Sequence, residues 1–193
     1  KYKKFIHRRK KNEPMAYILK KKEFWNYTFK LNNEVLIPRP ETEIIVREVL
    51  NLTNNNSSKH ILDVGTGSGC ILLSILNERQ KCFGTALDIS KKAINVAISN
   101  AKIHHLENKI KFLNIDVDKF NHNKYDLIVS NPPYINNTDL KRLDKDVQLY
   151  EPKVALNGGI DGLRVIKKII KKSKTLLKKN GKLIFEIGKN QMP

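Results

Sequence analysis

The stretch "LDVGTGSGC" at residues 62–70 joins an apolar run to a segment with helical spacing, and it decides which folds the chain can form. Glycines at 65, 67 and 69 allow a tight turn and let the backbone approach a ligand that a Cβ atom would obstruct. The spacing differs from the GxGxxG of dinucleotide-binding loops, and no Lys-Ser or Lys-Thr follows, as a phosphate-binding P-loop would require. Taken alone, the loop is equally typical of an ordinary turn between a strand and a helix.

Outward from this loop, apolar runs of strand length alternate with segments of helical length. The runs lie at 61–64, 82–87, 110–113, 125–129 and 182–187, and the expected helices lie near 70–78, 91–104 and 162–179. This alternation predicts an α/β fold with a mostly parallel sheet that carries helices on both faces. Ligands of such sheets bind beyond the carboxyl ends of the strands.

The first 60 residues follow another pattern. Apolar and polar residues alternate over 24–37, with two asparagines in the middle, and this predicts a β-hairpin or ribbon that Pro38 and Pro40 end. The segment "ETEIIVREVLNL" at 41–52 begins with acidic residues and has apolar residues near helical spacing. We expect a helix there.

Composition limits the classes of protein that remain. The chain has 37 Lys and Arg against 19 Asp and Glu, a formal net charge of +18. Such an excess can indicate a nucleic-acid partner, but the surplus is mostly lysine without interleaved aromatic residues, as a coding bias would produce. A nucleic-acid surface is therefore possible but not favoured. Two cysteines, Cys70 and Cys82, suit neither a zinc cluster nor a disulfide framework, so we expect no metal site. Without an apolar run of about 18 residues, we expect a cytoplasmic protein that does not enter a membrane.

Carboxylates follow the next two apolar runs. Asp88 stands where nucleoside-binding folds place a carboxylate that accepts hydrogen bonds from both ribose hydroxyls. The alternative is a simple helix start, with Ser90 as its N-cap. Asp116 can accept a hydrogen bond from an adenine amino group, with Ile89 and Val117 beside the base. Together with the glycine loop, these residues predict an adenosine pocket at successive strand ends.

The stretch "SNPPYI" at 130–135 has a more specific chemistry. A planar amino group, in an amide or a nucleobase, is a poor nucleophile because its lone pair is delocalised. The side-chain oxygen of Asn131 and the backbone carbonyl of Pro132 can each accept one N–H and hold the nitrogen in place. Pro132 and Pro133 restrict the loop, and Tyr134 offers a ring face for stacking. A sulfonium methyl group placed in line with the nitrogen would then need no strong base.

These motifs resemble those of the class I S-adenosylmethionine-dependent methyltransferases that act on planar nitrogens. The wider sequence resembles the protein-(glutamine-N5) methyltransferases of the PrmC/HemK type, the release factor glutamine methyltransferases. The resemblance runs from about Pro14 to the end of the chain and rests on these stretches: "LIPRPETE" (36–43), "ILDVGTGSGCI" (61–71), "DLIVSNPPYI" (126–135), "YEPKVAL" (150–156), "GGIDGL" (158–163) and "FEIGKNQ" (185–191). It implies a Rossmann-like fold, S-adenosyl-L-methionine as cofactor with S-adenosyl-L-homocysteine as product, and methylation of the glutamine in the Gly-Gly-Gln (GGQ) loop of peptide chain release factors.

The resemblance also assigns roles to individual residues. It places the cofactor on Gly65, Thr66, Gly67, Ser68, Gly69, Asp88, Asp116, Val117 and Asn131. It makes Asn131, Pro132 and Tyr134 catalytic, and it gives the substrate amide to Asn131, Pro132, Pro133 and Tyr134. Arg39, Glu41 and Thr42 are expected to help close the pocket, and Glu151 and Pro152 to shape its rim.

The chain departs from the family pattern at its ends. Family members usually begin with a helical domain and continue past "EIGxxQ" through a further helix and strands. We therefore expect 1–23 to be the remnant or linker of an N-terminal helical domain, 24–40 a β-hairpin linker, and 41–193 the methyltransferase domain, with the helical domain and the C-terminal strands incomplete.

Two other functions remain open on the sequence alone. The same NPPY chemistry serves exocyclic amino groups of nucleic acids, adenine N6 or guanine N2, although "PRPETE" and "YEPKVAL" argue against it. The chain could also be an inactive remnant that still binds the cofactor. The leading prediction is a monomeric release factor glutamine methyltransferase.

Overall fold

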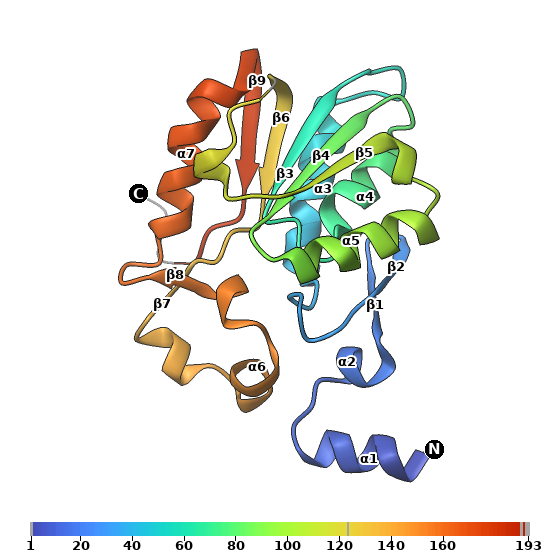
Figure 1. Cartoon of the computed structure of the whole chain (residues 1–193), viewed down its shortest axis with the longest axis vertical. Coiled ribbons are helices and arrows are strands. Elements are labelled where there is room, and N and C mark those ends of the chain that lie inside the picture. Colours follow the sequence, from blue (N-terminus) through green and yellow to red (C-terminus); the bar gives the residue numbers. More distant parts are fainter. Residues whose placement is uncertain (1, 123, 190, 192–193) are drawn as a thin grey trace.

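The computed structural model describes residues 2–122, 124–189 and 191, and its centre is a five-stranded sheet (Figure 1). All neighbouring strands pair in parallel, in the order β5-β4-β3-β6-β9. The strands are β3 (His60–Val64), β4 (Phe83–Asp88), β5 (Ile110–Asn114), β6 (Tyr125–Ser130) and β9 (Leu177–Phe185). The predicted α/β class with a parallel sheet is confirmed.

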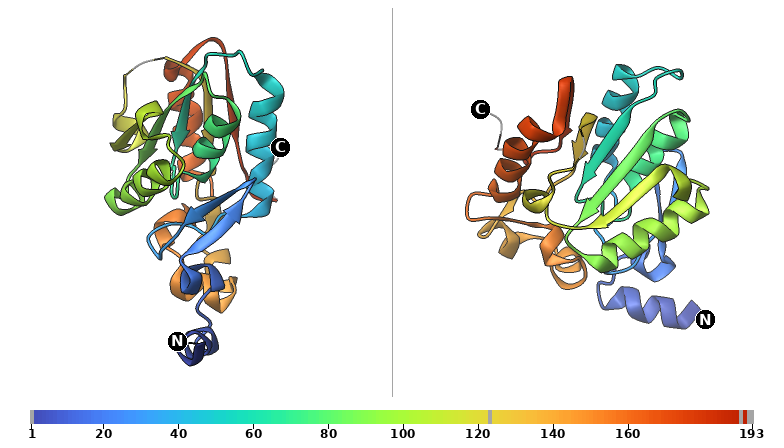
Figure 2. Two further views of the ribbon diagram at one scale, coloured as in Figure 1. Left: turned by 90° about the vertical axis from the view of Figure 1, so that its right-hand side faces the viewer. Right: turned by 45° about the horizontal axis from the view of Figure 1, so that its top comes forward.

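Helices cover both faces of this sheet (Figures 1 and 2). One face carries α3 (Glu43–Leu52), α4 (Cys70–Glu78) and α5 (Lys91–Ile103), and the other carries α7 (Arg164–Leu176). Successive strand residues point to opposite faces, so Ile61 joins one core cluster and Leu62 the other, both fully buried. Burial on both faces explains why these strands read as continuous apolar runs.

The N-terminal part forms α1 (Tyr2–Lys10), α2 (Met15–Leu19) and a hairpin of β1 (Lys21–Phe24) and β2 (Tyr27–Lys30). The ribbon expected over 24–40 is therefore wrongly placed: its first strand begins at residue 21, and 31–39 contain no strand. The reason is that residues 21–23 are all exposed, so this strand carries no apolar alternation. The turn uses Trp25 at φ 55°, without a glycine to signal it.

A lobe built from residues 131–163 lies beyond the carboxyl end of β6, close to α1 and α2 (Figure 1). It contains β7 (Ile135–Asn136), η4 (Asp139–Arg142), α6 (Lys145–Tyr150), η5 (Lys153–Ala155) and β8 (Asn157–Gly159). The Tyr150 hydroxyl donates a hydrogen bond to the carbonyl of Lys11 at 2.8 Å, which ties the lobe to the N-terminal helices. The remaining short helices are η1 (Pro40–Thr42), η2 (Glu107–Lys109) and η3 (Val117–Lys119).

The strand order places a reversal at β3. Strands β4 and β5 lie on one side of β3, and β6 and β9 lie on the other. The loops that leave β3 and β6 therefore diverge and open a crevice at the carboxyl edge, which is where such sheets bind ligands. Both sequence motifs of interest, the glycine loop and "NPPY", follow these two strands.

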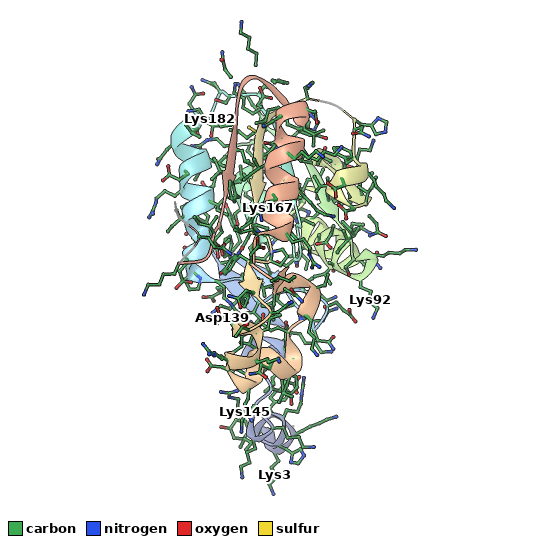
Figure 3. All side chains as sticks on the ribbon, turned by 90° about the vertical axis from the view of Figure 1, so that its left-hand side faces the viewer. Lys3, Lys92, Asp139, Lys145, Lys167 and Lys182 are labelled. Atoms are coloured by element: carbon green, nitrogen blue, oxygen red, sulfur yellow. The ribbon has the colours of Figure 1, made fainter. Side chains whose placement is uncertain are left out.

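Exposed lysines lie on several different elements of the molecule. Figure 3 shows Lys3 and Lys182 at opposite ends, with Lys92, Lys145 and Lys167 between them on different elements. Two of these already pair with carboxylates, Lys92 with Glu34 and Lys167 with Asp161. None of the helices in the described ranges combines the length and the apolar character needed to cross a bilayer. Lys1, Asn190, Met192 and Pro193, at the outer ends of the expected regions 1–23 and 41–193, lie outside the described residues.

Candidate active site

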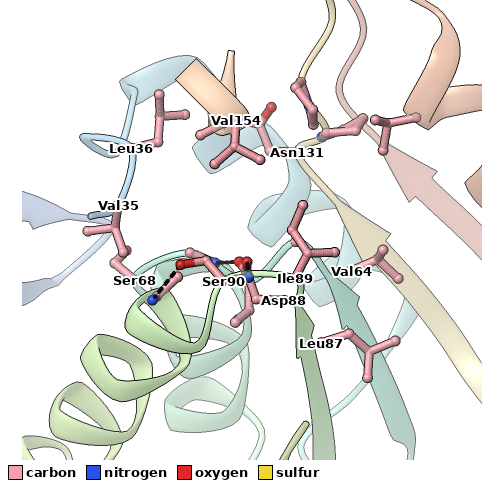
Figure 4. Close-up of a pocket in the computed structure, with 18 of the residues that line it drawn as sticks. Val35, Leu36, Val64, Ser68, Leu87, Asp88, Ile89, Ser90, Asn131 and Val154 are labelled. Carbon is pink, nitrogen blue, oxygen red and sulfur yellow. Dashed lines mark hydrogen bonds between the residues drawn. The ribbon is translucent and has the colours of Figure 1, made fainter. Parts of the chain in front are cut away.

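A cavity of about 370 Å³ occupies the crevice at the carboxyl edge of the sheet. Figure 4 shows Asp88 on one side of it, with Asn131 and Val154 across the open space. The loops after β3, β4, β5 and β6 all contribute to its wall. Of the predicted site residues, it is lined by Gly65, Thr66, Gly67, Ser68, Asp88, Asp116, Val117, Asn131, Pro132 and Pro133.

The start of the glycine loop is shaped to receive a ligand. The amides of Gly65 and Thr66 both donate to the carbonyl of Leu87 at 2.9 Å, which curls the loop over the end of β4. Gly65 has φ +76°, and a Cβ added there would meet no protein atom within 4 Å. At Gly67, with φ +55°, the same Cβ would meet only the Gly65 carbonyl, at 4.0 Å. The space beside both glycines therefore belongs to the cavity.

Gly69 has a different role from the one predicted. It does not line the cavity but precedes α4 at φ +82°. A Cβ there would lie 2.9 Å from Cδ1 of Leu73 and 3.4 Å from Cβ of Ala97. The missing side chain thus serves the left-handed turn and close packing against α4 and α5, not contact with a ligand.

Asp88 is held in place by backbone amides. Its Oδ2 accepts a hydrogen bond from Gly67 N at 3.0 Å, and its Oδ1 accepts one from Ser90 N at 2.8 Å. Burial raises the pKa of this carboxyl, although the amide hydrogen bonds oppose the shift. Ser90 also caps α5, since its Oγ accepts a hydrogen bond from Ala93 N at 3.2 Å. Ser90 is therefore an N-cap, as expected from the alternative, and Asp88 lines the cavity, where its binding of ribose hydroxyls stays a prediction.

Asp63 lies beneath the glycine loop and does not line the cavity. It is fully buried, and its Oδ2 accepts a hydrogen bond from the Thr66 hydroxyl at 2.7 Å. Its Oδ1 has no hydrogen-bond partner among the described residues. Burial, with a smaller contribution from the charge of Asp88, raises the pKa of Asp63 to about 7, although the Thr66 hydrogen bond lowers it.

Asp116 lines the cavity, but its side chain already has partners. Its Oδ1 accepts from Asp118 N at 3.0 Å, and its Oδ2 accepts from Lys168 Nζ at 3.2 Å. Burial raises the pKa of Asp116, but the Asp118 amide and the Lys168 ammonium outweigh it and bring the pKa below its usual value. An adenine amino group would share this carboxylate with Lys168. Val117 is buried and Ile89 is exposed, and both line the cavity, so the prediction that they flank a flat base is compatible with their positions.

The loop after β6 brings Asn131 into a hydrogen-bonded network. Its Nδ2 donates to Oγ1 of Thr42 at 2.9 Å, and the Thr42 hydroxyl donates to Oε2 of Glu186 at 2.7 Å. The Tyr134 hydroxyl donates to Oε1 of the same carboxylate at 2.9 Å. Burial, reinforced by the charge of Glu186, raises the pKa of Tyr134 to about 12, so the phenol stays protonated. Asn131, Pro132 and Pro133 line the cavity, whereas Tyr134 lies outside its lining.

The segment before α3 closes the cavity from the other side. Glu151 is 4% exposed, and its Oε1 accepts from Nη2 of Arg39 at 2.6 Å while its Oε2 accepts from Ile37 N at 3.2 Å. This carboxylate therefore fastens the "PRPETE" segment to the lobe. Arg39 and Thr42 line the cavity, but Glu41 and Pro152 do not.

Several residues of the site were not among the predicted site residues. Val35, Leu36 and Val154 supply apolar wall: the first two lie before η1 outside any helix or strand, and Val154 lies in the short η5, and the sequence predicted none of them as a site residue. Asn100, fully buried in α5, donates through Nδ2 to the carbonyls of Ser68 and Lys30, which ties the glycine loop to β2. Glu186 follows β9, and only its place in "FEIGKNQ" could have drawn attention to it.

The arrangement suits an adenosine compound. A carboxylate at Asp88, an open cradle at Gly65 and apolar residues at Ile89 and Val117 match a ribose, the chain attached to it and a flat base. Within residues 2–122, 124–189 and 191, no cluster of three or more His, Cys, Asp or Glu could hold a metal ion.

Comparison with known proteins agrees with this geometry. The family model of the methyltransferase small domain matches residues 42–148. Proteins named release factor glutamine methyltransferase are similar over nearly the whole chain. The one from Buchnera aphidicola subsp. Baizongia pistaciae is 41% identical, over 96% of this chain and 66% of that protein, and the one from Fusobacterium nucleatum is 42% identical, over 95% of this chain and 52% of that protein. The one from Thermodesulfovibrio yellowstonii is 38% identical, over 98% of this chain and 68% of that protein. The chain thus spans from about half to two thirds of the length of these relatives.

Solved structures share the fold at low sequence identity. A ribosomal protein L11 methylase from Lactobacillus delbrueckii subsp. bulgaricus matches with a TM-score of 0.56 at 18% identity, over 85% of this chain and 69% of that one. A SAM-dependent methyltransferase from Geobacter sulfurreducens, solved with S-adenosyl-L-homocysteine, matches with a TM-score of 0.52 at 18% identity, over 76% and 47%. The fold is therefore that of the class I methyltransferases, as expected.

Proposed function

Because this chain belongs to the release factor glutamine methyltransferase family, we propose that it transfers a methyl group from S-adenosyl-L-methionine to a glutamine side-chain nitrogen of a peptide chain release factor. The acceptor is the glutamine of the GGQ loop. The other functions considered, methylation of nucleic-acid amino groups and cofactor binding without activity, become outcomes of the test below.

The cofactor is held by the glycine loop and the strand ends. Asp88 accepts hydrogen bonds from the ribose hydroxyls, Ile89 and Val117 flank the adenine, and Asp116 borders its amino group. Gly65 to Ser68 follow the methionine side. When bound, S-adenosyl-L-methionine supplies an electrophilic methyl group on a sulfonium. The apolar residues around it exclude water, which protects the methyl group from hydrolysis and strengthens nearby polar contacts.

The glutamine amide is held by the loop after β6. Its two N–H groups are accepted by Oδ1 of Asn131 and the backbone carbonyl of Pro132, and these acceptors stabilise the positive charge that develops on the nitrogen. Pro133 lines the cavity and confines the flat amide, and Tyr134, outside the lining, supports this loop through its hydrogen bond to Glu186. Because the nitrogen gains the methyl group before it loses a proton to water, no strong base is required. Positioning therefore carries most of the rate enhancement.

One observation carries the proposal: Asn131 and Pro132 lie in the wall of the same cavity as Gly65 and Asp88. A cavity that combines acceptors for an amide with a carboxylate for a nucleoside can hold the glutamine and the cofactor next to each other, as methyl transfer requires. The wider architecture is a separate part of the proposal, which family membership rather than the cavity supports. Residues 41–193 form the methyltransferase domain, and residues 24–40 form a linker before it. The protein acts as a monomer in the cytoplasm, without a membrane or a metal ion.

The test is transfer of labelled methyl from S-adenosyl-L-methionine to a purified release factor, with DNA and RNA in parallel. The proposal predicts label on the release factor, and none after the GGQ glutamine is changed to alanine. Label on nucleic acid would indicate the amino-group methyltransferase instead. Cofactor binding without any label would indicate an inactive protein.

A further inference from the structure

The side-chain amide of Asn131 has two possible orientations, and only one of them serves the proposed reaction. With Oδ1 toward the cavity, Asn131 accepts an N–H of the substrate. After a flip of the amide, Nδ2 would face the substrate nitrogen, donor against donor. Something must therefore select the orientation, because an asparagine amide is nearly symmetric in shape.

The hydrogen bonds from Asn131 to Thr42 and from Thr42 to Glu186 determine the orientation of the Asn131 amide. The Thr42 hydroxyl donates its single hydrogen to Oε2 of Glu186 across 2.7 Å. The Thr42 oxygen then has only lone pairs left to offer. Asn131 can meet it only with an N–H, which is the contact between Nδ2 and Oγ1 at 2.9 Å.

The surroundings keep these hydrogen bonds between Asn131, Thr42 and Glu186 in one arrangement. Thr42 is 2% exposed, so water does not compete for its hydroxyl. Tyr134 occupies the other oxygen of Glu186 at 2.9 Å, and its raised pKa, about 12, keeps its proton in place. The three segments involved, η1, the end of β6 and the end of β9, converge from distant parts of the sequence. Their meeting point is the wall of the cavity at Asn131.

We propose that Glu186 and Thr42 are positioning residues that fix the Asn131 amide with its oxygen toward the substrate nitrogen. This rests on the proposed function, since it concerns the acceptor of that reaction. Neither residue touches the reacting atoms; both act through Asn131. The "PRPETE" motif, through Thr42, and the "FEIG" motif, through Glu186, thus both orient Asn131.

Thr42→Val tests this directly, since valine keeps the shape and removes the hydroxyl. We expect kcat for release factor methylation to fall about 10- to 100-fold, which is less than the roughly 100- to 1,000-fold of a directly lost transition-state hydrogen bond because Thr42 acts through Asn131. The Kd for S-adenosyl-L-homocysteine should stay within about 2-fold of wild type, because Thr42 does not hold the cofactor. Thr42→Ser, which restores the hydroxyl, should regain most of kcat.

The matched control is Thr53→Val. Thr53 lies at the other end of α3, is also buried, and donates its hydroxyl to the carbonyl of Val49 at 2.7 Å. Its loss should lower stability without a selective fall in kcat. The inference is overturned if Thr42→Val and Thr53→Val have the same kcat. A fall that Thr42→Ser does not rescue, or a parallel loss of cofactor affinity, would also overturn it.

A second readout needs no methyl transfer and so separates this inference from the proposed function. In NMR spectra of the chain with S-adenosyl-L-homocysteine, the Asn131 side-chain NH₂ should show nuclear Overhauser contacts to the γ-methyl of Thr42. The NH₂ protons should also exchange slowly, and this protection should be lost in Thr42→Val. Absence of these contacts in the wild type would refute the orientation even if methylation occurs. Their presence without methylation would count against the proposed function alone.

Discussion

Single residues define the nucleoside half of the site, and Asp88 is the most informative of them. Asp88→Asn keeps the size of the side chain but removes the charge that strengthens hydrogen bonds from ribose hydroxyls. Since such charged hydrogen bonds contribute about 1.5–3 kcal/mol, we expect the Kd for S-adenosyl-L-homocysteine to rise about 10- to 100-fold in calorimetry. Asp161→Asn removes the same charge from an exposed ion pair and should bind like wild type. Equal affinity of the two variants would contradict the ribose assignment.

Asp63 should make stability depend on pH in an unusual direction. In the unfolded chain its carboxyl ionises near its ordinary pKa of 3.8, whereas burial raises the folded pKa to about 7. The native state therefore holds a proton that the unfolded state has released, so the free energy of unfolding falls as pH rises from about 4 to about 7. The total change is on the order of 4 kcal/mol, and above pH 7 this contribution is constant.

Urea unfolding at a series of pH values measures this effect, with Asp63→Asn as the comparison. The difference between wild type and variant isolates Asp63 from the other titrating groups. Between pH 4 and 7, the free energy of unfolding of the wild type should fall relative to that of Asp63→Asn. A difference that does not vary with pH would show that Asp63 ionises normally in the folded protein.

At this scale the sequence predicts the cofactor side of the site better than the substrate side. Glycines and Asp88 follow strands directly, and strand ends are visible as the limits of apolar runs. The network of Thr42, Asn131 and Glu186 was out of reach because it joins three distant segments that meet only in the folded sheet. The partner of Asp116, Lys168, was equally hidden, because α7 reaches it across the sheet's end.

Among the elements, the loop between β3 and α4 contains Gly65, which faces the cavity, and Gly69, which packs against protein atoms, and alanine substitutions should have different effects at the two positions. Gly65→Ala places a methyl group in the cavity without touching protein atoms, so we expect only the backbone strain of about 1–2 kcal/mol and a large loss of cofactor affinity. Gly69→Ala carries the same strain and in addition crowds Leu73 and Ala97, at a cost of about 1 kcal/mol or more.

Urea unfolding and calorimetry on both variants give the comparison. Gly69→Ala should be the less stable protein, and its folded fraction should still bind S-adenosyl-L-homocysteine. Gly65→Ala should be the more stable one but bind poorly. The reverse pattern would mean that Gly69, not Gly65, faces the ligand.

Elements with strong apolar signals were predictable almost to the residue, and those without were not. Helix α4 matches its expected range, 70–78, because a run of buried, mostly apolar side chains from Cys70 to Leu76 directly follows the glycine loop. Helix α7 ends at Leu176, and β9 begins at once at Leu177, although the pattern favoured a helix to 179. Here exposed lysines carry no information about the change from helix to strand. The short elements of the lobe, such as α6 with no buried residue, leave no periodic signal.

At the scale of the whole molecule, Glu151 joins the lobe to the segment that precedes α3. Glu151→Ala would leave the Ile37 amide and the Arg39 guanidinium without this partner. Because removing one member of a buried pair typically costs 3–5 kcal/mol, and Arg39 is one-third exposed, we expect a loss of about 2–3 kcal/mol in the free energy of unfolding. The cofactor should also dissociate faster, since the cavity loses its closure.

Lys92→Ala provides the matched control for this prediction. It breaks an exposed ion pair to Glu34, in the same segment, and should cost about 0.5 kcal/mol or less. Urea unfolding and stopped-flow release of S-adenosyl-L-homocysteine report the two effects. If Glu151→Ala behaves like Lys92→Ala in both, the segment is not held by Glu151.

The central claim is that the cavity joins a methyl donor to a carboxamide nitrogen, and peptide mass spectrometry of the methylated substrate tests it most directly. After incubation of a release factor with the chain and S-adenosyl-L-methionine, fragmentation of the GGQ peptide should locate one added methyl group on the glutamine side chain. Asn131→Ala should abolish it while leaving cofactor binding measurable. A methyl group on any other residue, or on the glutamine to the same extent with Asn131→Ala, would contradict the account.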